Sequence, residues 1–214
     1  MTQNTDKTVN RVYVAYVYNG LKIWSTRGSL GFVSIALLLI FNFTVYRKRS
    51  DPILKRITPW RHIYMGATIG LGVLGGYLAV TPGIPSTPQI YLIFLSSTLW
   101  IAGFDMIYVI PDIETDQRLG LKTVMTRFGT DRGLLISTLT HAVSFIAMLI
   151  VGLYIDSFWY FVMLVPILGL MILQHRIIDP SNPSSVRASF FGANSFIGIL
   201  FLVGLILAYN FGGI

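Results

Sequence analysis

Residues 62–104 read HIYMGATIGLGVLGGYLAVTPGIPSTPQIYLIFLSSTLWIAGF, and this run contains no Lys, Arg, Asp or Glu. Residues 188–214 are equally free of charge. Over the whole chain of 214 residues only 12% are charged and 54% are apolar, whereas a soluble domain carries about 25% charged residues. A water-soluble fold could not cover its surface with so few charges. The absence of cysteine also excludes a disulfide-stapled secreted domain.

The apolar segments predict an all-α fold, a polytopic transmembrane helical bundle of about six spans. Each segment is close to the roughly 20 residues that a spanning helix needs, and none shows the period-2 alternation of a strand. The expected spans are residues 28–46, 63–80, 89–110, 133–155, 158–174 and 189–210. The loop at residues 81–88, TPGIPSTP, ends the second span because its prolines and glycine cannot continue a helix.

Basic residues are confined to alternate loops. They are Arg47, Lys48, Arg49, Lys55, Arg56 and Arg61 after the first span, Arg118, Lys122, Arg127 and Arg132 after the third, and Arg176 and Arg187 after the fifth. Because Lys and Arg collect in cytoplasmic loops, these loops are expected on the cytoplasmic side. The net charge of +7 therefore reflects membrane topology, and nucleic acid is not expected as a partner.

Residues 1–27 form a separate polar or interfacial segment before a membrane domain at 28–214. An even number of spans with a cytoplasmic first loop places residues 1–27 outside, although they contain Lys7, Arg11, Lys22 and Arg27. Residues 9–24 are apolar and aromatic but are interrupted by two of these charges. They are expected either to lie in the membrane interface as an amphipathic helix or to be the remnant of an earlier span.

Four carboxylates, Asp105, Asp112, Glu114 and Asp116, follow directly after the uncharged run. On a helix at 100° per residue, the three aspartates fall within about 40° of one another. Tyr108 lies about 60° to one side of Asp105, and Glu114 points to the opposite face. The spacing predicts a stripe of three aspartates and a tyrosine at the end of a membrane helix, with Glu114 as a solvated residue.

Carboxylates within a membrane span need compensation, because each costs about 2.5–3.5 kcal/mol at the span centre. Mg²⁺ takes hard oxygen ligands and completes its shell with water and substrate phosphates. We therefore expect Asp105, Asp112 and Asp116 to hold Mg²⁺ together with a diphosphate, which Lys122 contacts directly. The alternative is a solvated acidic loop that caps a helix.

The residues from Asp105 onward resemble the second aspartate motif of the UbiA superfamily of intramembrane prenyltransferases. That motif reads Asp-x-x-Tyr-x-x-x-Asp-x-x-x-Asp, then Gly-[Ile/Val/Leu]-Lys-[Ser/Thr] and Phe-Gly. This chain has Asp105, Tyr108, Asp112 and Asp116, then GLKT at 120–123 and FG at 128–129. Weaker similarities are KRIT at 55–58 and FFGAN at 190–194. The resemblance covers residues 28–214, which correspond to the last six of the family's nine helices.

The resemblance implies transfer of a polyprenyl group from a polyprenyl diphosphate, through an allylic carbocation. Asp112 and Asp116 would hold Mg²⁺, with Asp105 beside them, and Tyr108 could stabilise positive charge through its ring face. The implied diphosphate ligands are Lys122, Lys55 and Arg56, although the last two have the alternative of plain cytoplasmic-loop cations. Asn194 would line the substrate cavity or form a hydrogen bond between helices.

Two departures from the family leave the activity open. The family's first motif, Asn-x-x-x-Asp-x-x-x-Asp, is absent, and Asp51 stands where a Tyr often precedes the KRIT element. One hypothesis is a prenyltransferase chain that is truncated or is completed by a second chain. Another is a non-catalytic membrane protein or lipid-binding subunit derived from that fold. A third, an unrelated transporter, would require an internal repeat, which the sequence does not show.

The implied acceptor is an aromatic, 4-hydroxybenzoate-like molecule of quinone biosynthesis. The run IPDIE at 110–114 is also similar to carotenoid-elongating members, which gives a second alternative. The histidines, His62, His141 and His175, are dispersed and lack metal-site spacing. His141 lies in a span, where a hydrogen-bonded polar residue is a more common role than a metal ligand.

Overall fold

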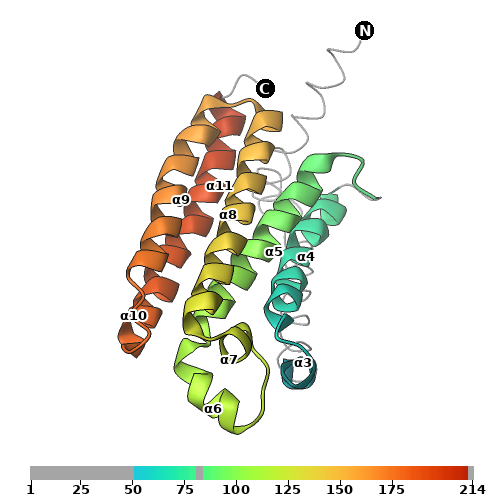
Figure 1. Cartoon of the computed structure of the whole chain (residues 1–214). Helices are drawn as coiled ribbons and strands as arrows, with labels where there is room; N and C mark the ends of the chain where they lie inside the picture. Colours follow the sequence, from blue (N-terminus) through green and yellow to red (C-terminus); the bar gives the residue numbers. More distant parts are fainter. Residues whose placement is uncertain (1–50, 81–83, 212–214) are drawn as a thin grey trace.

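The protein is a bundle of long helices that run up and down in turn (Figure 1). A computed structural model describes residues 51–80 and 84–211. The long helices are α4 (Arg61–Val80), α5 (Pro88–Tyr108), α8 (Thr130–Ile155), α9 (Phe158–Arg176) and α11 (Asn194–Phe211). Every regular element in the described part is helical, which confirms the all-α prediction. The expected span at 28–46 and the segment 1–27 lie outside the described residues.

Four helices in the described part are long and apolar enough to cross a membrane. They are α5, α8, α9 and the helix that runs through Pro183–Phe211. These four confirm a polytopic helical protein. The predicted second span forms α4, a helix of 20 residues, but it is not among the four.

The end of α5 differs from the prediction. The predicted stripe requires one helix through Asp116, but α5 ends at Tyr108 and a 3-10 turn, η2 (Ile110–Asp112), follows it. A short helix, α6 (Ile113–Arg118), then begins. Pro111 explains the break, because proline has no N–H and its ring clashes with the preceding turn. The three aspartates therefore lie on three different elements, and the angular spacing of a continuous helix does not apply to them.

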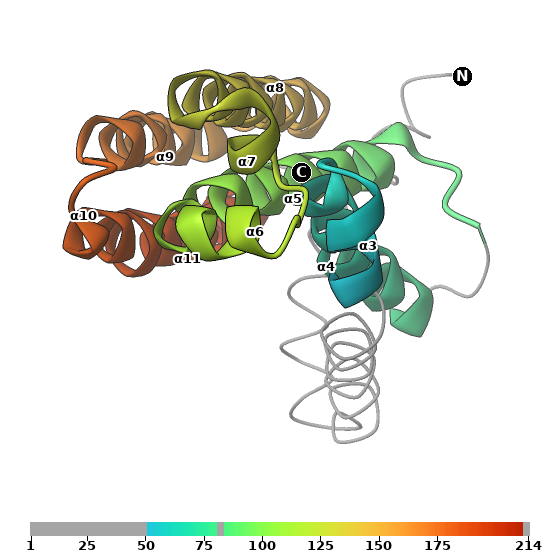
Figure 2. The same ribbon diagram turned by 60° about the horizontal axis from the view of Figure 1, so that its bottom comes forward.

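The short helices gather at one end of the bundle, which Figure 2 turns toward the reader. They are α3 (Asp51–Ile57), α6, α7 (Val124–Phe128) and α10 (Pro183–Arg187). The opposite end carries the segment at 84–87 and the turn at Asp156. All Lys and Arg side chains of the described residues belong to the end with the short helices, because they lie in its loops, in its short helices or in the adjoining first or last turns of long helices.

Small residues allow the helices to approach closely. A Cβ on Gly66 of α4 would overlap the backbone carbonyl of Thr98 on α5. Between α5 and α8, the hydroxyl of Ser137 donates to the carbonyl of Gly103 at 2.7 Å, and Ser144 donates to the carbonyl of Ser96 at 2.8 Å. Membrane helices commonly associate through such small residues and interhelical hydrogen bonds, because lipid removes the hydrophobic driving force between them.

A second packed region joins α8, α9 and α11. Tyr160, Ile167 and Ile197 are almost fully buried there, and the Tyr160 hydroxyl donates to the carbonyl of Met148 at 3.0 Å. Large apolar side chains such as Val165 face outward. This inside-out distribution suits helices that are surrounded by lipid tails instead of water.

Candidate functional site

Lys55 of α3 and Asp116 of α6 join two short helices that are far apart in the sequence, at the basic end of the bundle. The Lys55 Nζ lies 3.6 Å from Asp116 Oδ1. The backbone N–H of Lys122 donates to the carbonyl of Lys55 at 2.5 Å, and the Lys122 ammonium lies 3.5 Å from the carbonyl of Ile57. The KRIT and GLKT elements, which are separate in sequence, therefore form one structure around Asp116.

The backbone of the GLKT element explains its residue types. Gly120 has a φ of +66°, a conformation that glycine adopts without steric cost. Thr123 caps α7: its hydroxyl accepts a hydrogen bond from the Thr126 N–H at 3.1 Å, and the Thr126 hydroxyl accepts one from the Thr123 N–H at 2.8 Å. This reciprocal cap and the glycine turn fix the path of the chain on both sides of Lys122.

Asp116 retains an unused oxygen. Its side chain is buried, and Oδ2 has no hydrogen-bond partner among the described residues. A buried carboxylate oxygen without a partner carries a free-energy cost. A ligand that supplies positive charge would offset this cost.

Asp105 lies in a buried ion cluster that the sequence analysis missed. Its Oδ2 accepts a hydrogen bond from His62 Nδ1 at 2.6 Å and lies 3.7 Å from an Arg61 guanidinium nitrogen. Both partners are buried at the start of α4. Sequence spacing gives no signal for this cluster, because His62 and Asp105 are 43 residues apart and meet only through the packing of α4 against α5.

The other expected site residues lie at or near the surface of this end. Asp112 and Tyr108 are exposed, as is Arg56. Glu114 is also exposed and pairs with Arg118 at 3.3 Å within α6, as expected of a solvated residue. Sequence alone thus proposed Asp112 and Asp116 as equivalent, whereas the structure buries only Asp116.

Asn194 is the first residue of α11 and follows a π-helical segment, η3 (Ala188–Ala193). Its side chain is buried, and Oδ1 has no partner among the described residues. The side-chain oxygen therefore makes no interhelical hydrogen bond within this part of the chain. Both expected roles of Asn194 stay predictions.

The three aspartates do not gather into a metal site made by protein ligands alone. In residues 51–80 and 84–211, no group of three or more His, Cys, Asp or Glu side chains is placed to hold a metal ion. One or two carboxylates completed by water and phosphate are the usual Mg²⁺ arrangement. The free Asp116 Oδ2 and the exposed Asp112 fit that arrangement, while Asp105 is already engaged by His62 and Arg61.

The family model described as "UbiA prenyltransferase family" matches residues 14–205. The chain belongs to this family. The match extends over most of the chain, including the aspartate elements and the helices that carry them. It confirms the resemblance drawn from the Asp105 motif, and with the spanning helices it identifies an integral membrane protein.

Curated relatives carry names of aromatic prenyltransferases. The chain is 30% identical over 179 residues to a mitochondrial 4-hydroxybenzoate polyprenyltransferase of Arabidopsis thaliana, with coverage of 82% of this chain and 41% of the relative. It is 30% identical over 184 residues to a 4-hydroxybenzoate octaprenyltransferase of Alkalilimnicola ehrlichii, with coverage of 85% and 60%. The chain thus spans about half the length of the curated relatives it matches.

A solved structure has the same fold. The apo structure of a UbiA homolog from Aeropyrum pernix superposes with a TM-score of 0.64 and 26% sequence identity, and the match covers 82% of this chain and 67% of that one. The family is named for prenyl transfer and the two curated relatives for 4-hydroxybenzoate as the acceptor, while the solved structure shows the shared fold.

Proposed function

We propose that this chain takes part in Mg²⁺-dependent transfer of a polyprenyl group from a polyprenyl diphosphate to a 4-hydroxybenzoate-like acceptor. The observation that carries the proposal is the junction of Lys55, Asp116 and Lys122. The Lys55 ammonium pairs with Asp116, whose second oxygen has no partner among the described residues, and the Lys122 backbone is bound to the Lys55 carbonyl. A diphosphate with bound Mg²⁺ carries negative oxygens, which the lysines can balance. It also carries a cation, which the second Asp116 oxygen can balance.

The residues of the chain would act on the charge that develops as the carbon–oxygen bond to diphosphate breaks. Lys55 and Lys122 stabilise the leaving diphosphate, and Arg56 adds positive charge at the same end. The exposed ring of Tyr108 can stabilise the allylic cation through its face. The acceptor then forms the new carbon–carbon bond and loses a proton.

Mg²⁺ would be held by Asp116 and Asp112 and would supply electrostatic stabilisation of the phosphate oxygens. Asp105 stands apart from this pair, because its carboxylate is bound by His62 and Arg61. In this proposal Asp105 adds negative charge without binding the metal ion. Its part is to orient the start of α4 against α5.

The site is proposed to face the cytoplasm, since the described Lys and Arg residues lie at the same end of the bundle. The sequence contains no first aspartate motif, so a full active site would need that motif from a longer chain or a second chain. None of the comparisons points to a second chain. A non-catalytic, lipid-binding member is the competing proposal, and the missing motif is the observation that favours it.

The experiment that tests the proposal is prenyl transfer by the purified chain in lipid vesicles. The assay supplies Mg²⁺, a polyprenyl diphosphate and 4-hydroxybenzoate, and mass spectrometry detects the prenylated acid. Asp116→Asn is expected to reduce product formation at least a hundredfold. Glu114→Gln is the matched control, because Glu114 is an exposed acid of the same short helix.

Product that forms equally well with Asp116→Asn would contradict the proposed site. Binding of the diphosphate without any product would favour the non-catalytic alternative. A carotenoid-type acceptor, tested in the same vesicles, is compared with 4-hydroxybenzoate. Product from the carotenoid-type acceptor alone would overturn the aromatic assignment.

A further inference from the structure

Three exposed arginines stand on helices that take no part in the Asp116 junction. Arg132 lies in the first turn of α8, Arg176 is the last residue of α9, and Arg187 is the last residue of α10. All three side chains are exposed at the basic end of the bundle. The proposed prenyl transfer uses none of them.

The elements that carry these arginines adjoin one another at the end of α9. His175, the residue before Arg176, has its Nδ1 3.2 Å from the hydroxyl of Thr138 on α8. On the other flank, the hydroxyl of Ser189 in η3 donates to the carbonyl of Gln174 on α9 at 3.0 Å. The end of α9 therefore lies between α8 and the segment that follows α10, as Figure 2 also shows.

No carboxylate pairs with these three arginines within residues 51–80 and 84–211. The salt bridges of that part lie in α3, in α6 and where α4 meets α5. Asp179, which follows α9, already accepts hydrogen bonds from the N–H and the hydroxyl of Ser181 at 2.9 Å and 2.6 Å. Asp131, at the start of α8, is exposed. Three cations against two acids leave this surface positive.

The residue type of these cations favours phosphate. After Lys122 the chain contains no further lysine, and its only Lys or Arg residues are four arginines, the three named above and Arg127 of α7. The planar guanidinium group donates two parallel hydrogen bonds to a phosphate, whereas an ammonium group acts as a point charge. The surface is therefore suited to phosphate oxygens.

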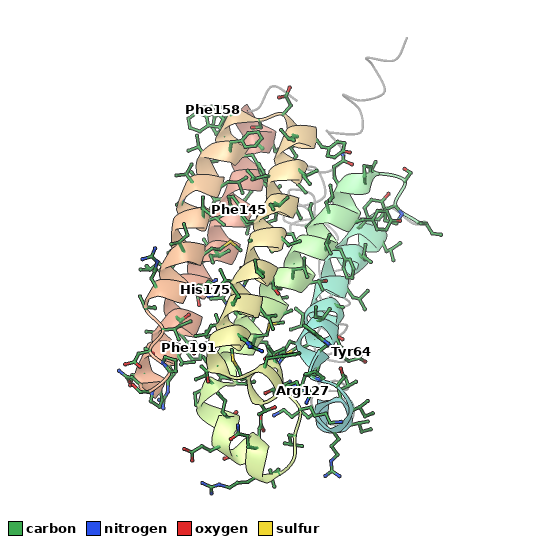
Figure 3. The ribbon with its side chains drawn as sticks, in the orientation of Figure 1. Tyr64, Arg127, Phe145, Phe158, His175 and Phe191 are labelled. Atoms are coloured by element: carbon green, nitrogen blue, oxygen red, sulfur yellow. The ribbon has the colours of Figure 1, made fainter. Side chains whose placement is uncertain are left out.

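Exposed apolar side chains border the arginines on the side of the spans. Within one helical turn of an arginine, α8 exposes Leu135, α9 exposes Ile172 and Leu173, and η3 exposes Phe191. Figure 3 labels His175 and Phe191 in this region. Arginine stems lie along such apolar surface while their charged heads reach the polar layer. Phosphate-binding groups thus lie at the level where lipid headgroups meet acyl chains.

We propose that the surface formed by Arg132, Arg176 and Arg187 binds the headgroups of anionic phospholipids. The acyl chains of the lipid would lie along the exposed apolar side chains of α8 and α9. Basic residues between membrane helices commonly hold anionic headgroups in this way. Because the surface is positive, it prefers a lipid with net negative charge to zwitterionic phosphatidylcholine. The lipid is a bound partner of the fold and is not a substrate of prenyl transfer.

Native mass spectrometry of the full chain in a non-ionic detergent, titrated with phosphatidylglycerol, tests the proposal. Phosphatidylglycerol should bind at least about tenfold more tightly than phosphatidylcholine. Arg132→Gln, Arg176→Gln and Arg187→Gln should each weaken phosphatidylglycerol binding by up to about fivefold, and the triple variant should lose the preference. Arg176→Lys keeps the charge and should lose less than Arg176→Gln.

Arg118→Gln is the matched control, because it removes the same charge from an exposed position of α6. It should leave the affinity for phosphatidylglycerol unchanged. An equal loss in Arg118→Gln and Arg176→Gln would show that only net charge matters and would overturn the proposal. Equal affinity for the two lipids, or unchanged affinity in the arginine variants, would also overturn it.

Inorganic phosphate added to the same titration separates a lipid site from a site for free anions. Release of phosphatidylglycerol by phosphate at unchanged ionic strength would assign the arginines to a free anion and would overturn the proposal. Circular dichroism checks that each variant is folded, and the single variants decide the test if the triple variant does not fold. The titration contains no Mg²⁺ and no polyprenyl diphosphate, so its failure leaves the proposed prenyl transfer untouched.

Discussion

Asp105 shows that contacts between residues far apart in the sequence cannot be predicted from motif spacing. The motif that contains Asp105, Asp112, Asp116 and Lys122 is local, so its spacing was enough to propose all four. The partners of Asp105 come from another helix, and their contribution depends on burial. Inside an apolar bundle the carboxylate has a histidine nitrogen at 2.6 Å and an arginine nitrogen at 3.7 Å, because an isolated buried charge would be very costly.

Replacing His62 by Leu is therefore expected to lower the stability of the protein. The change removes a hydrogen bond to a buried carboxylate, a loss of about 1.5–3 kcal/mol. His62→Gln keeps a donor and should lose less. Chemical unfolding in mild detergent, followed by circular dichroism, measures the difference.

Ile63→Leu provides the comparison for these variants, because Ile63 is the next residue of α4 and is exposed. It should unfold like the parent protein. A His62→Leu protein as stable as Ile63→Leu would show that the hydrogen bond between His62 and Asp105 does not stabilise the fold.

At the scale of elements, apolar length predicted α5, α8, α9 and α11, because a spanning helix needs a long run without charges. The same reasoning extended α5 too far. Its predicted stripe fails at Pro111, where the loss of an N–H outweighs the helical pattern of the aspartates. The close approach of α4 to α5 could not be predicted from the sequence either. Helix α4 contains several glycines, and only the packing shows which of them contacts α5.

Two glycines of α4 should respond in opposite ways to alanine. At Gly66 the added methyl group would meet the backbone of Thr98, which cannot move aside, so Gly66→Ala should destabilise the protein by about 1–3 kcal/mol. At Gly76 nothing lies within 4 Å, so Gly76→Ala should be neutral or stabilising by up to about 1 kcal/mol.

Thermal unfolding of the two alanine variants in the same detergent measures this contrast. Equal melting temperatures for Gly66→Ala and Gly76→Ala would show that α4 does not pack on α5 at Thr98. A fall confined to Gly66→Ala agrees with the small-residue contact between these helices.

For the whole molecule, the distribution of Lys and Arg among the loops predicted the topology, because these residues collect in the loops on the cytoplasmic side. The structure agrees as far as it is described: the basic loops share one end of the bundle, and the uncharged segment at 84–87 lies at the other (Figure 1). The orientation of these ends across a membrane remains the prediction of that rule.

The absence of cysteine makes this orientation directly testable. Single substitutions Gln117→Cys and Ser86→Cys place thiols at exposed positions of opposite ends. In intact cells a membrane-impermeant maleimide should label Ser86→Cys, while Gln117→Cys should react only after the membrane is opened. The reverse pattern would place the aspartate loops outside the cytoplasm.

The most direct test of the central claim is the binding of a non-reactive polyprenyl diphosphate analogue to the purified chain in lipid, measured by calorimetry with and without Mg²⁺. Binding should require Mg²⁺ and should weaken at least tenfold in Asp112→Ala and in Asp116→Ala. Absence of Mg²⁺-dependent binding, or unchanged affinity in both variants, would contradict a diphosphate site at these aspartates.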